Sequence, residues 1–368
     1  TTGASILEDV ESAPPGILIW RAILQWLGGI GIIVTAMSIL PFLGVGGMQL
    51  FRTESSENEK ALPRATQLAS SIGLIYLGLT ILCALAYGMA GMTDFDAIAH
   101  AMTTIATGGY STFNSSFGAF DNAWREITAL VFMYTGALPF ILYLKTVRGD
   151  VRPLLRNAQV RFFTGAILIG IILMSTYVYV ATPMGIFETI RRSAFSVVAT
   201  ITTTGYNNAG YESWGAFPIA FFFFLMVVGG CAGSTTCGIK IFRFQILFSV
   251  IQAQLKQVLN PNAKFAARYN GRPIPAGVPS AVISFLFLYA LCFAVLACLL
   301  SMTGLDFITA LSGAAASISN IGPGLGPIIG PEGTYQSLNH IAKWLLSAGM
   351  ILGRLELLTV LVLFSPHF

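Results

Sequence analysis

Four short polar segments that contain glycine recur along an otherwise apolar chain. In order they are Thr2-Gly3-Ala4-Ser5, Thr107-Gly108-Gly109-Tyr110, Thr204-Gly205-Tyr206-Asn207 and Ile321-Gly322-Pro323-Gly324. Glycine tolerates backbone angles that a Cβ atom penalises, so each segment can form an extended strand whose carbonyl groups face one axis. Four such strands around one axis would supply rings of carbonyl oxygens, which can replace the hydration shell of a cation.

The surroundings of these segments repeat as well. The last three copies follow short amphipathic stretches at 94–106, 186–202 and 305–318, which are too short to cross a bilayer and stop at a glycine. A short helix that ends halfway at glycine is typical of a re-entrant pore loop. The sequence therefore predicts a repeating unit of helix, pore loop and helix, about a hundred residues long. The C-terminal, partially negative ends of the short helices would then point towards the pore.

The composition indicates a membrane protein, as such re-entrant units require. Of the 368 residues, 55% are hydrophobic and only 10% are charged, whereas soluble proteins carry about 25% charged residues. Apolar runs long enough to cross a bilayer occupy 17–42, 67–90, 126–145, 162–182, 215–255, 278–302 and 341–364. The chain is therefore expected to be an all-α, multi-pass membrane protein, with four pseudo-repeats around a central pore and the first repeat truncated.

The charges predict the orientation of these spans. Lysine and arginine concentrate at 52–64, 145–161 and 256–272, whereas the acidic residues lie mostly on the opposite side, together with the short re-entrant stretches. Because basic loops face the cytoplasm, the re-entrant stretches enter from outside. The apolar runs contain neither paired acids nor a histidine cluster, so we expect neither an enzyme, a resident metal site nor an organic cofactor.

The repeat also predicts boundaries along the chain. Residues 1–60 form the second half of repeat 1, with its filter and second helix, and 61–150 form repeat 2. Repeat 3, with a broken second helix, spans 151–260, and repeat 4 spans 261–368. Because the chain starts directly before the first polar segment, we expect that upstream material is missing from it.

The fifth apolar run is interrupted by a glycine-rich stretch. Four glycines fall within the ten residues 229–238, which disfavours a helix. Unwound backbone at membrane depth is tolerated only where protein or water satisfies its polar groups. We therefore expect a gating loop that lines the cavity below the filter, although a glycine-rich kink for helix packing is the alternative. Its candidate residues are Gly229, Gly230, Gly233, Ser234, Thr235, Thr236, Gly238 and Lys240.

Charged residues within the apolar runs are the remaining candidates. Arg354 lies near the middle of the last run, where a charge costs about 3 kcal/mol. Glu356 is two residues away and cannot face it on a helix, so the carbonyls and hydroxyls of the broken loop are the expected partners. We predict that Arg354 is an electrostatic barrier in the pore, with a structural role at a subunit interface as the alternative. Lys240 and Arg243 are expected to be anchors at the inner interface.

The motifs TTGAS (1–5), ATGGYS (106–111), TTGYN (203–207), SNIGPG (319–324), GGCAGSTTCGIK (229–240) and GRLELL (353–358) together resemble those of one family. This is the TrkH/KtrB/HKT superfamily of potassium transporters, and the resemblance is closest to the TrkH branch of bacterial inner membranes. It implies that the potassium ion is the transported species and that the polar segments form its selectivity filter. The filter residues so implied are Thr2, Gly3, Thr107, Gly108, Thr204, Gly205, Asn320, Ile321 and Gly322.

The resemblance also implies the assembly and the mode of transport. It implies a homodimer that docks a cytosolic regulatory subunit of the TrkA type, which binds a nucleotide of the NAD or ATP class, and no nucleic acid. One departure is Ile321, which stands where the other three signatures have threonine. Potassium uptake through a gated, channel-like pore is the expected function. The alternative is a secondary symporter of potassium with protons or sodium, whose repeats would alternate in topology.

Overall fold

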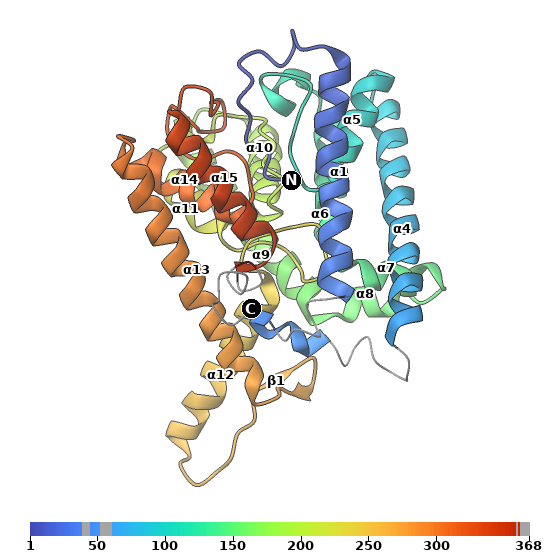
Figure 1. Ribbon diagram of the computed structural model, residues 1–368, viewed down its shortest axis with the longest axis vertical. Coiled ribbons are helices and arrows are strands. Elements are labelled where there is room, and N and C mark those ends of the chain that lie inside the picture. Colours follow the sequence, from blue (N-terminus) through green and yellow to red (C-terminus); the bar gives the residue numbers. More distant parts are fainter. Residues whose placement is uncertain (39–44, 52–60, 358–359, 361–368) are drawn as a thin grey trace.

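The computed structural model describes residues 1–38, 45–51, 61–357 and 360, and most of them lie in helices (Figure 1). Four helices are long and apolar enough to cross a membrane: α1 (Pro15–Ser38), α4 (Ala61–Met89), α9 (Ala158–Ala181) and α13 (Gly277–Met302). Only 22–33% of each apolar window is buried inside the protein. Apolar side chains on the other faces suit a helix surrounded by lipid. The multi-pass, all-α architecture is therefore confirmed.

The three re-entrant helices lie where the sequence predicts them. They are α5 (Asp94–Ile105), α10 (Ile186–Ile201) and α14 (Phe307–Ser319). Thr93 and Asp306 cap the first and last of them, because their side chains accept hydrogen bonds from the backbone N–H groups of Asp96 and Thr309. In all three the C-terminal half is buried, and it ends at a polar segment.

Two predicted spans are broken. The run at 215–255 divides, as expected, into α11 (Ala216–Met226) and α12 (Ile241–Leu259). The run at 126–145 was expected to be one helix, which is wrong: α6 (Ala123–Gly136) and α7 (Phe140–Val147) meet at 97°. Pro139 at the bend lacks an N–H for the helical ladder. The N–H of Phe140 donates instead to the carbonyl of Gly233, at 2.9 Å.

The last predicted span is interrupted at residues 355 and 356. Helix α15 (His340–Arg354) ends at Arg354, whereas the sequence suggested a span over 341–364, part of which lies outside the described residues. Glu356 has φ 61°, a left-handed conformation that does not continue a helix. Arg354 therefore lies at the end of a helix and not near its middle. The smaller elements are η1 (Val45–Phe51), η2 (Ser116–Phe120), α8 (Arg152–Arg156), η3 (Tyr211–Trp214) and the antiparallel pair β1 (Arg268–Tyr269) and β2 (Arg272–Pro273).

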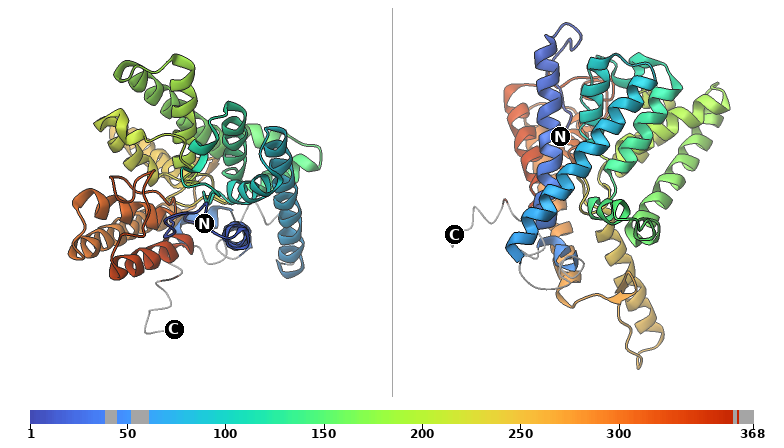
Figure 2. Two further views of the ribbon diagram at one scale, coloured as in Figure 1. Left: turned by 90° about the horizontal axis from the view of Figure 1, so that it is seen from above. Right: turned by 90° about the vertical axis from the view of Figure 1, so that its right-hand side faces the viewer.

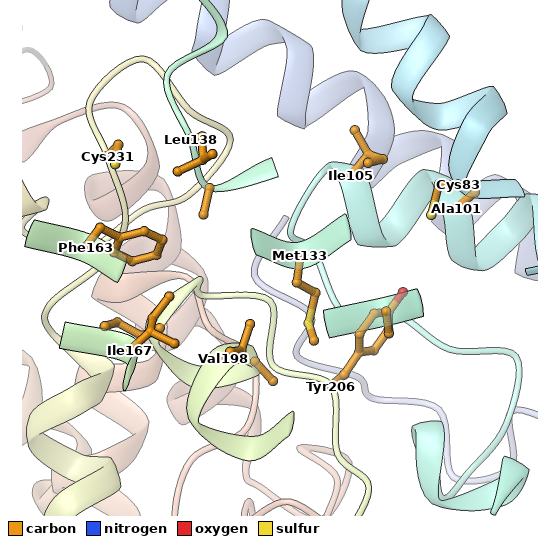
Figure 3. Packing of buried hydrophobic residues seen from close by; sticks show 14 of the residues in the cluster. Cys83, Ala101, Ile105, Met133, Leu138, Phe163, Ile167, Val198, Tyr206 and Cys231 are labelled. Carbon is orange, nitrogen blue, oxygen red and sulfur yellow. The ribbon is translucent and has the colours of Figure 1, made fainter. Parts of the chain in front are cut away.

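The helices surround the N-terminal segment when the molecule is seen from above (Figure 2, left). Each long or broken helix that follows a polar segment packs against the re-entrant helix of the next unit: α1 against α5, α6 against α10, and α11 against α14. One hydrophobic core joins α4, α5, α6, α9 and α10 (Figure 3), and it includes Cys231 of the unwound stretch. The sequential packing brings all four polar segments to the centre.

Candidate functional site

Three of the polar segments leave their re-entrant helices along the same backbone path. The N–H groups of Gly108, Thr204 and Ile321 donate to the carbonyl five residues earlier in the chain, at 2.8, 2.9 and 3.0 Å. The residue before each one is left-handed, with φ 49° at Thr107, 55° at Thr203 and 54° at Asn320. These two matches define which residues are structurally equivalent.

This equivalence corrects the alignment made from the sequence. Within the four polar segments, the glycines with positive φ are Gly3, Gly109, Gly205 and Gly322, at 84°, 78°, 74° and 105°. Gly108 is not among them, and it corresponds instead to the residue before that glycine. The prediction was wrong by one residue because two successive glycines look alike in a sequence.

The corrected alignment also changes which residues of the four segments lie at the same depth, and we call each such set of four a row. Gly108 lies level with Thr2, Thr204 and Ile321, so Ile321 does not face three threonines. The row before it contains Thr1, Thr107, Thr203 and Asn320. One position in the ring of Ile321 therefore has no side chain, which the sequence alignment did not reveal.

The four segments close into a ring. A Cβ atom added to Gly3 would overlap the carbonyl oxygen of Gly108, and one added to Gly109 would overlap that of Thr204. Gly205 meets the carbonyl oxygen of Ile321 in the same way, and Gly322 meets that of Thr2 at 2.6 Å. Each glycine thus lies against a carbonyl of the next segment, and the fourth lies against the first. The oxygens of Thr2, Gly108, Thr204 and Ile321 converge at this ring, and only glycine leaves them room.

A cavity of about 160 Å³ lies at the outer mouth of the ring. All four positive-φ glycines line it, together with the acidic side chains of Glu8 and Glu332. Arg21 also lines it, with its guanidinium 4.0 Å above the ring of Tyr110. The charged side chains named here therefore leave one excess negative charge, which attracts cations.

A carboxyl group behind this mouth binds the loop that follows the fourth segment. Oε1 of Glu212 accepts a hydrogen bond from the N–H of Gly326, at 2.5 Å. Burial raises the pKa of the Glu212 carboxyl, the hydrogen bond from Gly326 opposes the rise, and the nearby charge of Glu332 adds to it. Glu212 therefore joins η3 to the loop that follows the fourth segment.

The unwound stretch lies directly below the ring. Oγ1 of Thr107 donates to Oγ1 of Thr235 at 3.1 Å, and the N–H of Cys237 donates to Oγ1 of Thr203 at 3.0 Å. The hydroxyl residues Ser234, Thr235 and Thr236 are fully buried. The predicted loop residues therefore lie together beneath the segments, with Gly229, Gly233 and Gly238 at positive φ and Gly230 packed against Thr236.

Arg354 joins this stretch to two other elements. Its Nη1 donates to the carbonyl of Thr235 at 3.0 Å and to Sγ of Cys237 at 2.8 Å. Its Nη2 donates to the carbonyl of Gly28 in α1, at 2.7 Å. The expectation that carbonyls of the loop are partners of Arg354 is confirmed. Its remaining partners are the thiol of Cys237 and the carbonyl of Gly28, in place of the expected hydroxyls.

Lys240 and Arg243 are not anchors at the membrane interface, and that prediction was wrong. Arg243 is fully buried, and its Nη2 lies 2.7 Å from Oε2 of Glu356. Its other donors reach the carbonyls of Gly46 at 2.9 Å and Ile239 at 2.8 Å. Lys240 is also buried, and its Nζ donates to the carbonyl of Thr236 at 3.0 Å. The carboxylate of Glu356 and these carbonyls replace the water that the sequence reasoning assumed.

One prediction arises from the contact between the ring and the loop. Thr203→Val keeps the side-chain shape but leaves the buried N–H of Cys237 without its acceptor, which costs about 1–3 kcal/mol. If the loop closes the pore, basal ion flux into liposomes should rise about fivefold or more. Thr189→Val is the matched control, because Thr189 is buried in α10 and its hydroxyl has no hydrogen-bond partner. Equal flux in the two variants would contradict a closing role for this contact.

A resident metal site is not found among the described residues, where no three histidine, cysteine, aspartate or glutamate side chains come together. Sequence reasoning missed the contact of Gln25 with the ring and the pairing of Glu356 with Arg243. Gln25 was detectable as a lone amide within an apolar helix, whereas the pairing of Glu356 with Arg243 leaves no local signal.

Comparisons with known proteins agree with one another. The family model TrkH, described as cation transport protein, matches residues 1–367. The Trk system potassium uptake protein TrkI of Halomonas elongata is 46% identical, over 100% of this chain and 75% of that protein. TrkH of Escherichia coli K12 is 38% identical over 100% of this chain and 77% of its own length. The crystal structure of the potassium transporter TrkH from Vibrio parahaemolyticus superposes with a TM-score of 0.90 at 35% identity, covering 100% of this chain and 76% of that one.

Proposed function

The chain belongs to the TrkH family of cation transport proteins, and from this we propose that it takes up potassium ions across a bacterial inner membrane. The observation that carries the proposal is the closed ring in which each positive-φ glycine lies against a carbonyl of the next segment. The four units of this pore are those bounded by 1–60, 61–150, 151–260 and 261–368.

The ring suits a dehydrated monovalent cation. Its carbonyl oxygens replace water ligands, and the C-terminal ends of α5, α10 and α14 add partial negative charge below it. In the corrected register the potassium ligands are the backbone carbonyls of Thr2, Gly108, Thr204 and Ile321, followed outward by those of Gly3, Gly109, Gly205 and Gly322. The row of Thr107, Thr203 and Asn320 forms the inner end of the filter, where Thr107 and Thr203 contact the loop.

The loop at 229–240 and Arg354 form the gate of the pore. Both lie below the ring, and the hydrogen bonds of Arg354 hold the loop to α1 and α15. A channel opens when this loop moves aside. The alternative, a symporter that couples potassium to protons or sodium by alternating access, would need halves of inverted topology. In the three complete units the re-entrant helices instead all enter the membrane from the same side, which supports the channel.

Flux measurements on the purified protein in liposomes test this function. Potassium and rubidium should move down their own gradients much faster than sodium and lithium. A proton or sodium gradient should not drive potassium uphill. Uphill potassium uptake driven by either gradient would establish the symporter instead, and equal flux of all four ions would contradict a potassium filter.

Two kinds of partner belong to the proposal. One is a second copy of the chain, and the other is a cytosolic nucleotide-binding subunit of the TrkA type. Arg148, Arg152 and Arg156 are exposed on and beside α8, on the basic side of the protein. Reversing these three charges to glutamate should weaken co-purification with the regulatory subunit at least tenfold. Lys343→Glu, on the opposite side, is the control, and unaltered complex formation in the triple variant would limit these residues to setting topology.

A further inference from the structure

One ring position lacks a side chain, and a residue from another unit fills its place. Thr2, Thr204 and Ile321 carry side chains at this level, whereas repeat 2 has Gly108. A Cβ atom on Gly108 would overlap the side-chain amide of Gln25. Gln25 belongs to α1, in the unit before, and only 2% of its surface is exposed. Its amide therefore occupies the volume that a threonine would take.

Both ends of this amide bind the backbone of the second segment. Nε2 of Gln25 donates to the carbonyl oxygen of Gly108 at 2.7 Å, and Oε1 accepts from the N–H of Tyr110 at 3.1 Å. The two hydrogen bonds hold the residues on either side of Gly109, whose Cα lies against the carbonyl of Thr204. A buried amide with both groups satisfied fixes the strand that it binds.

The carbonyl of Gly108 is one of the four in the ring, so this contact changes the ring itself. A carbonyl oxygen has two lone pairs, and Gln25 takes one of them. Within the described residues, none of the other three ring carbonyls accepts a hydrogen bond from a side chain. The amide donor of Gln25 withdraws electron density from the Gly108 oxygen and fixes the direction in which the Gly108 carbonyl points. The ring is therefore asymmetric in charge as well as in side chains.

We propose that Gln25 is a specificity-determining positioning residue, which holds the Gly108 carbonyl at the radius that favours potassium over smaller ions. The inference rests on the proposed function, because it assigns a part of the same filter. A role in packing alone would affect folding and flux, but not the ratio of two permeabilities. That ratio is read from the reversal potential, which does not depend on how many molecules are folded.

Gln25→Met and Gln25→Glu test the proposal in planar bilayers with potassium on one side and sodium on the other. Methionine keeps the length and removes both hydrogen bonds, whereas glutamate in its ionised form keeps the acceptor for Tyr110 and removes the donor to Gly108. One such hydrogen bond contributes about 1 kcal/mol, so each variant should raise sodium permeability relative to potassium about fivefold. Gln159→Met is the matched control: Gln159 is a buried glutamine that accepts from the N–H of Ala232 in the loop, so flux should change and the ratio should not.

A double variant keeps the proposal testable if Gln25→Met does not fold. Gly108→Thr alone should lose selectivity, because its side chain overlaps the amide of Gln25. Gly108→Thr combined with Gln25→Ala gives repeat 2 the threonine found in repeats 1 and 3, and it should recover at least half of the lost selectivity. Unchanged ratios in folded Gln25→Met and Gln25→Glu, or a double variant no better than Gly108→Thr, would overturn the inference. A wild-type protein without potassium selectivity would instead overturn the proposed function.

Discussion

Arg354→Ala should raise the basal potassium flux by tenfold or more and leave the ratio of sodium to potassium permeability unchanged. The substitution removes hydrogen bonds to the carbonyls of Thr235 and Gly28 and to the thiol of Cys237. It also removes a fixed positive charge, because a guanidinium stays protonated at any attainable pH. A cation that passes about 7 Å away at an effective dielectric constant of 20 experiences roughly 2 kcal/mol of repulsion. Selectivity should persist because the ring lies above this level.

Two further variants separate charge from contact at this position. Arg354→Lys retains the charge but cannot reach three acceptors in different directions, so its flux should lie between those of the wild type and the alanine variant. Arg192→Ala is the control, because the ion pair that Arg192 forms among the described residues joins it to Glu188 one turn away, on the outer side. Reduced flux together with loss of the proposed dimer in Arg354→Ala would show that the arginine is structural.

Gly205→Ser should raise sodium permeability relative to potassium about tenfold. The backbone of Gly205 has φ 74°, and a Cβ atom there would overlap the carbonyl oxygen of Ile321. Strain of about 1–3 kcal/mol at such a position pushes a ring carbonyl out of place. A widened or tilted ring then loses its preference for the ion whose hydration shell it replaces. Reversal potentials in bilayers measure the ratio directly.

A second glycine provides the matched control for strain alone. Gly304 has φ 90°, but a Cβ atom there would meet nothing within 4 Å. Gly304→Ser therefore imposes the same kind of backbone strain outside the ring, and its permeability ratio should equal that of the wild type. If Gly205→Ser folds and keeps the wild-type ratio, the ring does not determine selectivity. Gly108→Ser would act differently, because a side chain on Gly108 displaces Gln25.

The parts of the fold that depend on length and composition could be predicted from the sequence. The re-entrant helices were placed within about two residues, because each is a short amphipathic stretch that stops at glycine. The break after α11 was found for a similar reason, since glycines crowd that stretch. The bend between α6 and α7 was missed although Pro139 marks it, because the apolar run continues on both sides.

The parts that depend on contacts distant in sequence could not be predicted. The choice between Gly108 and Gly109 is made by hydrogen bonds back into α5 and by the neighbouring segment, neither of which leaves a local pattern. The burial of Arg243 depends on Glu356 and on the carbonyl of Gly46, both far along the chain. A single sequence therefore predicted interfacial anchors, which is the ordinary position of basic residues at the end of a span.

The most direct test of the account is the position of a bound ion in crystals of the protein grown with thallium, a monovalent cation close to potassium in size. Anomalous scattering locates thallium without reference to the protein. We expect a peak on the axis between the carbonyl oxygens of Thr2, Gly108, Thr204 and Ile321, and we expect excess potassium, but not excess sodium, to abolish it. A ring without a peak in crystals that bind thallium elsewhere would contradict the assignment of these four segments as the filter.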